Sequence, residues 1–81
     1  MTEKFPQLKT NEVALVMAEI NTGHVLDEHL RLATTNDQKV YTVFSSLKDA
    51  VNYAKEFIAQ NSGVECNIYG SENNFLLRID K

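Results

Sequence analysis

The alternation of apolar and polar residues is most regular between Ser46 and Gln60. Ser46 followed three residues later by Asp49 is a capping-box pattern, which marks a helix start. Asn61 to Gly63 supplies residues that tolerate the left-handed conformation common after a helix end. The apolar residues between these signals recur three and four positions apart and form one stripe: Leu47, Ala50, Val51, Ala54, Phe57 and Ile58. The pattern predicts one amphipathic helix with both ends specified.

Other parts of the chain have the composition of β-strands. They are rich in β-branched, aliphatic and aromatic residues and are bounded by turn residues. The predicted strands are Glu12 to Ile20, Lys39 to Phe44, Val64 to Tyr69 and Phe75 to Ile79. In the last two, the alternation predicts an inward-facing set: Val64, Cys66, Ile68, Phe75, Leu77 and Ile79.

Residues 24–33 (HVLDEHLRLA) fit two structures. The preceding turn signal, Asn21 to Gly23, and a poor helix cap favour a strand that forms a hairpin with Glu12 to Ile20. In that strand, Asp27 belongs to a solvent-facing set. Helical spacing also groups Leu26 with Leu30, so a helix is the alternative.

The order of elements predicts an α+β fold, β-β-β-α-β-β, in one domain over residues 12–81. An antiparallel sheet of four to five strands carries one main helix on one face. The order becomes β-α-β-α-β-β if residues 24–33 are helical. Residues 1–11 form a polar tail whose apolar side chains, Phe5 and Leu8, are candidates for docking onto the domain.

Charge and composition exclude several classes of function. The 81 residues carry a net charge of −3 with no basic cluster, which argues against nucleic-acid binding. The longest apolar run, Val13 to Ala18, is too short to span a membrane. A single cysteine, Cys66, excludes an internal disulfide, so we expect a reducing, cytoplasmic location.

Candidate chemistry is sparse. His24, Asp27, Glu28 and His29 are the one acid–histidine cluster, but their spacing does not bring a set of metal ligands together. Cys66 lies in the inward phase of a strand, which is typical of an inert buried thiol rather than a nucleophile. No glycine-rich phosphate-binding motif occurs. We therefore expect a non-catalytic protein without a metal or cofactor.

Two predicted strands, Glu12 to Ile20 and Lys39 to Phe44, are apolar in both phases, although one helix covers only one face of a sheet. Something is expected to cover the second face: the tail, a helix at residues 24–33, or a second chain. The predicted surface comprises Val16, Ala18, Ile20, Tyr41 and Val43. It predicts a homodimer or an unidentified protein partner, and the alternative is a monomer that binds a small molecule or peptide there.

Overall fold

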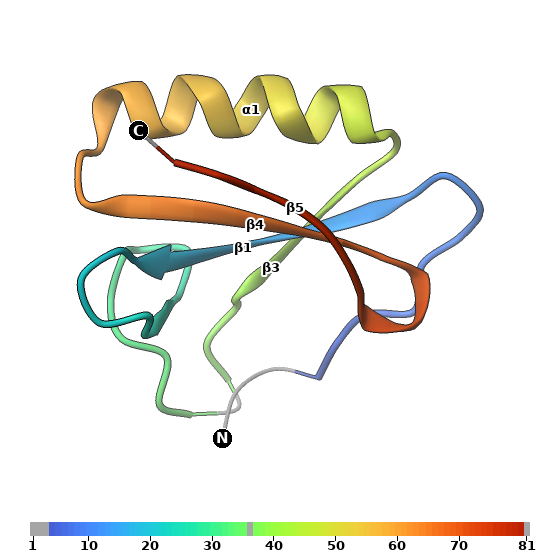
Figure 1. The fold of residues 1–81 in the computed structure, drawn as a ribbon. Helices are drawn as coiled ribbons and strands as arrows, with labels where there is room; N and C mark the ends of the chain where they lie inside the picture. Colours follow the sequence, from blue (N-terminus) through green and yellow to red (C-terminus); the bar gives the residue numbers. More distant parts are fainter. Residues whose placement is uncertain (1–3, 36, 81) are drawn as a thin grey trace.

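The computed structural model describes residues 4–35 and 37–80 and confirms the predicted α+β fold. One helix packs on one face of an antiparallel five-stranded sheet (Figure 1). The elements are β1 (Val13–Glu19), β2 (Val25–Leu26), β3 (Tyr41–Phe44), α1 (Leu47–Gln60), β4 (Val64–Gly70), the single 3₁₀ turn η1 (Ser71–Asn73) and β5 (Asn74–Ile79). Their order is the predicted β-β-β-α-β-β.

Strand β1 is the centre of the sheet. It pairs with β4 along one side, and β5 lies beyond β4. Its other side is shared, since Val13 to Val16 pair with β3 while Met17 and Ala18 pair with β2. One edge of the sheet is therefore the six-residue strand β5, and the other is divided between two short strands.

Helix α1 begins where the capping pattern predicted. The Asp49 backbone N–H donates to Ser46 Oγ at 3.2 Å, and the Asp49 carboxylate accepts a hydrogen bond from the Ser45 hydroxyl. Beyond the helix end, Gly63 takes a positive φ of 84°, which costs little for a residue without a side chain. Among the described residues, no helix is long and apolar enough to cross a membrane.

The main core lies between α1 and the sheet. Ala50, Ala54 and Ile58 of the helix pack against buried residues of β1, β2 and β4. The strand residues of this core are Val13, Leu15, Met17, Leu26, Val64, Cys66 and Ile68. The inward phase predicted for β4 is therefore confirmed, and this face of the sheet is called the helix face below.

Residues 24–33 form neither a full strand nor a helix. Only Val25 and Leu26 form β2, and an isolated bridge joins Leu26 to Leu32. The prediction that Asp27 faces solvent was wrong, because this residue is only 1% exposed. Its carboxylate binds the backbone N–H groups of His29 and Arg31, which turns the chain away from the sheet after β2.

A β-bulge changes the phase of β5. Ile68 pairs with Leu77 but Tyr69 pairs with Phe75, so Leu76 is an extra residue in β5. Leu77 and Ile79 pack against the core as predicted. The inward prediction for Phe75 was wrong, since its ring lies beside that of Tyr69 on the face opposite α1.

Candidate interaction surface

The face of the sheet opposite α1, called the second face below, is apolar at one end and polar at the other. Cross-strand pairing aligns two rows of residues there: Val43, Ala14, Tyr69 and Phe75 in the first, and Tyr41, Val16, Asn67 and Arg78 in the second. A third row contains Val25, Ala18 and Glu65. The first row is apolar throughout, whereas the second contains Asn67 and Arg78 and the third contains Glu65.

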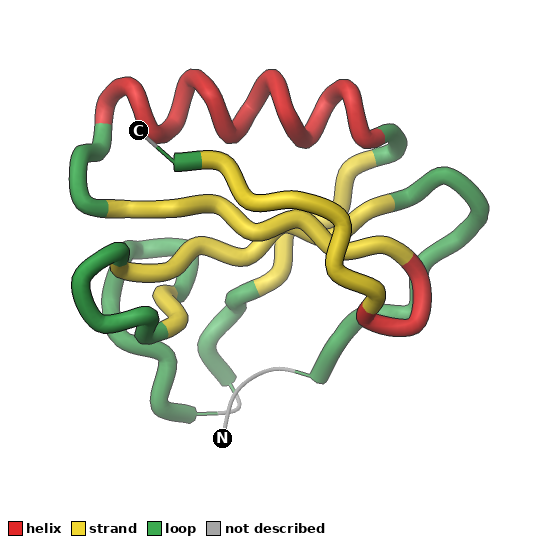
Figure 2. The backbone as a smooth tube through the Cα atoms, in the orientation of Figure 1, coloured by secondary structure: helices red, strands yellow, loops and turns green. Residues whose placement is uncertain are grey.

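The N-terminal tail crosses the apolar end of this face. Figures 1 and 2 show the tail and the loop before β3 on the side of the sheet opposite α1. The Phe5 ring meets Tyr41 edge-on at a centroid distance of 5.3 Å and Tyr69 at 6.2 Å. Tyr41 pairs with Val16 and Tyr69 pairs with Ala14, so Phe5 lies over the small side chains of β1 between the two tyrosines. The tail thus supplies part of the cover that a second apolar face needs.

The five residues of the predicted surface have different positions. Val16 and Ala18 are buried within the chain itself. Tyr41 is half-buried beside Phe5, and Val43 is 44% exposed at the end of the first row. Ile20 is exposed but lies past the end of β1 in the turn, where its backbone N–H donates to the Gly63 carbonyl. The structure therefore brings Val16, Tyr41 and Val43 together and leaves Ile20 apart.

The most exposed apolar residue of the first row, Phe75, was missed in the sequence. It is 53% exposed and contacts Tyr69 at a ring-centroid distance of 5.6 Å. Strict alternation placed Phe75 inward with Leu77. The only sequence signal of an irregular start to β5 is the preceding run of turn residues. In the structure two of them, Glu72 and Asn73, take a positive φ. We call the accessible apolar residues of this face the aromatic patch: Phe5, Tyr41, Val43, Tyr69 and Phe75.

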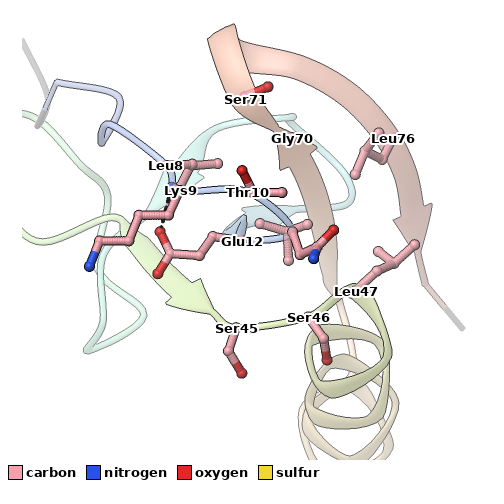
Figure 3. A pocket seen from close by; sticks show the side chains of 12 residues that line it. Leu8, Lys9, Thr10, Glu12, Ser45, Ser46, Leu47, Gly70, Ser71 and Leu76 are labelled. Carbon is pink, nitrogen blue, oxygen red and sulfur yellow. Dashed lines mark hydrogen bonds between the residues drawn. The ribbon is translucent and has the colours of Figure 1, made fainter.

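A groove of about 780 Å³ opens next to the aromatic patch, where the tail passes the start of α1. Figure 3 shows its apolar side chains, Leu8 from the tail, Leu47 from α1 and Leu76 from β5. Two of its polar side chains have partners within the chain, since Ser46 caps the helix and Glu12 Oε1 accepts from the Lys9 backbone N–H at 2.7 Å. The groove therefore combines three leucines with a largely polar rim.

A buried carboxylate organises the loop that covers the other edge of the sheet. Asp27 Oδ1 accepts from the His29 and Arg31 backbone N–H groups, and Oδ2 accepts from Gln38 Nε2 at 2.8 Å. Gln38 Oε1 in turn accepts from the backbone N–H groups of Thr34 and Thr35. The hydrogen bond from Gln38, those from the backbone and the nearby Arg31 charge lower the Asp27 pKa from 3.8 to about 2. This network is structural, because every oxygen of the carboxylate is occupied from within the loop.

The candidates for chemistry named from the sequence are a buried thiol and two exposed histidines. Cys66 is fully buried in the core, and burial, with the charge of Glu65, raises its thiol pKa to about 11. His24 and His29 are both exposed. Among residues 4–35 and 37–80, no three His, Cys, Asp or Glu side chains are grouped closely enough to hold a metal ion.

Comparisons with protein-family models, with curated proteins and with solved structures find no match to this chain. What the protein does is therefore inferred from its own surface.

Proposed function

We propose that this chain is a small, non-catalytic, cytoplasmic interaction domain that self-associates through its aromatic patch. The observation that carries the proposal is the exposure of Val43 and Phe75. Both remain open at the two ends of an apolar row whose middle the tail already covers. Apolar side chains gathered on one surface of a small domain are typical of interaction sites.

The composition of the patch supports a protein partner. Tyrosine and phenylalanine are enriched at the centres of protein interfaces, where they bury a large area at low entropic cost. A charged residue, Arg78, lies on the same face near Phe75, which suits a polar rim. A second copy is the simplest partner, because most oligomers are symmetric assemblies of one chain.

Light scattering over a concentration series tests the proposal. Wild-type protein is expected to approach twice the 9.2 kDa chain mass at high concentration. Phe75→Asp should remain monomeric, because it places a charge on the proposed contact. Asn52→Asp adds the same charge on the exposed side of α1 and should behave as wild type. A wild-type mass of one chain at every concentration contradicts self-association.

The groove favours a second candidate function, a monomer that binds a peptide or small molecule. Its volume lies within the range of ligand sites, and Leu47 and Leu76 are each 41% exposed beside it. A monomer that binds a hydrophobic dye in its native state, and loses that binding in Leu76→Asp, would support this candidate. Dye binding that persists in Leu76→Asp would contradict it.

A further inference from the structure

The two edges of the sheet differ in how they are protected. The edge formed by β2 and β3 is short and interrupted, and the loop organised by Asp27 runs beside it, where the Glu28 backbone N–H donates to the Lys39 carbonyl. Strand β5 forms the other edge, and among the described residues no strand pairs with its outer side. Its sequence, NFLLRI, contains no lysine or proline; the features that could discourage pairing are the bulge at Leu76 and the charge of Arg78, whose Nε lies 3.3 Å from Asp80 Oδ2.

The bulge at Leu76 places Phe75 and Arg78 on the same face. Residues three apart in a regular strand lie on opposite faces. Here Phe75 pairs with Tyr69 and Arg78 pairs with Asn67, both on the second face. The extra residue shifts the alternation by one position between them.

This spacing makes β5 self-complementary. In a symmetric antiparallel pair, the arrangement that uses all six residues sets Asn74 opposite Ile79, Phe75 opposite Arg78 and Leu76 opposite Leu77. Within one chain, Asn74 pairs with Gly70 and Ile79 pairs with Cys66. Gly70 and Cys66 are both in the helix-face phase of β4, so Asn74 and Ile79 also lie on one face. A register shifted toward the start of the strand would keep six residues paired only by including Asn73 and then Glu72, which take a positive φ and cannot continue the strand.

We propose that two copies of this chain associate by antiparallel pairing of their β5 edges, with the two-fold axis between Leu76 and Leu77, so that each Phe75 ring receives Arg78 of the other copy. This inference rests on the proposed self-association and confines the contact to the Phe75 end of the aromatic patch, so that Val43, on β3, lies outside it. Each copy supplies the aromatic ring for one contact and the guanidinium for the other, an attractive pairing that occurs twice per dimer. The two sheets become continuous, and both edges of the dimer are then the protected β2 and β3 edges.

A residue swap tests the pairing. Phe75→Arg should weaken dimerisation by about tenfold or more, because it sets two like charges opposite each other. The double variant Phe75→Arg with Arg78→Phe restores an arginine opposite each ring and should recover most of the wild-type affinity. Circular dichroism of each variant verifies that the fold is kept. A double variant no tighter than the single one contradicts the proposed register.

Cysteine cross-linking provides a second test in a Cys66→Ala background. A tagged Phe75→Cys chain mixed with an Arg78→Cys chain should form mixed disulfides several-fold faster than either chain forms with itself. If the protein is a dimer but mixed disulfides form no faster than the others, the edge pairing is wrong and self-association is still supported. A monomeric wild-type protein would overturn both.

Val43→Asp separates edge pairing from stacking of two second faces. Val43 lies three strands from Phe75 along the first row, so an edge-paired dimer should tolerate the change. Loss of the dimer in Val43→Asp, with the fold intact, would show that the faces stack and would contradict the edge pairing.

Discussion

Strands β1 and β5 are both apolar, yet the fold uses them in opposite ways. β1 is paired on both sides and covered on both faces, so its residues from Val13 to Ala18 are buried. β5 is paired on one side only, and Phe75 and Leu76 are exposed. An apolar strand is thus buried by its position in the sheet, and an apolar strand at an edge remains available to a partner.

A charge within β1 should have the largest effect. Val16→Asp places a carboxylate under Phe5 with no buried partner, which should cost about 4 kcal/mol or more and unfold a domain of this size. Loss of the helical signal in circular dichroism measures the effect. Val43→Asp, at the exposed end of the same face, should stay folded. A folded Val16→Asp would show that the second face of β1 is open.

Truncation of a leucine should distinguish the two strands by a smaller amount. Leu15→Ala removes a fully buried side chain from the helix-face core and should reduce the free energy of unfolding by about 3 kcal/mol. Leu77→Ala, which truncates a partly buried side chain of β5, should cost about 1 kcal/mol. Urea denaturation measures both values under conditions where the protein is monomeric. Equal losses would contradict the contrast between centre and edge.

Removal of the tail's aromatic side chain tests the cover over β1. Phe5→Ala exposes the space between Tyr41 and Tyr69 and should reduce the free energy of unfolding by about 1 to 2 kcal/mol. Gln7→Ala, an exposed change in the same tail, is the control. Urea denaturation of the two variants gives the comparison, and a Phe5→Ala protein as stable as the control would mean that the tail contributes nothing to β1.

Acidification should reveal the Asp27 network that protects the opposite edge. The folded-state pKa of about 2 lies below the ordinary 3.8, so the stability due to the carboxylate is complete above pH 3.8 and is lost as the pH falls toward 2. Asp27→Asn should therefore lower stability at neutral pH. Between pH 4 and about 2, the variant should lose less stability than the wild type does. Glu56→Gln, at an exposed position of α1, is the control. Thermal unfolding across this pH range measures the difference, and parallel pH profiles of wild type and Asp27→Asn would contradict it.

The fold was largely predictable because its strongest signals are local. Ser46, the apolar stripe and Gly63 specify α1 within one stretch of chain, and the alternation of β4 identifies its buried face. The sequence also indicated that β1 needed cover on two sides. These inferences depend on periodicity and capping, which do not require knowledge of distant contacts.

The remaining features depend on contacts between distant residues. Asp27 is buried because Gln38, eleven positions later, completes its hydrogen bonds, and no local pattern announces that partner. The bulge at Leu76 places Phe75 on the second face, and alternation along β5 alone does not reveal that extra residue. Phe5 and Leu8 were candidates for docking, but the choice of Tyr41 and Tyr69 as the site for Phe5 depends on the assembled sheet.

The most direct test of self-association at the β5 edge is a dilution series followed by backbone amide NMR. As the concentration rises, the account predicts shifts confined to residues 74–79 and their neighbours in β4, with the amides of β2 and β3 unchanged. Shifts centred on β2 and β3, or none up to the highest concentration, would contradict it.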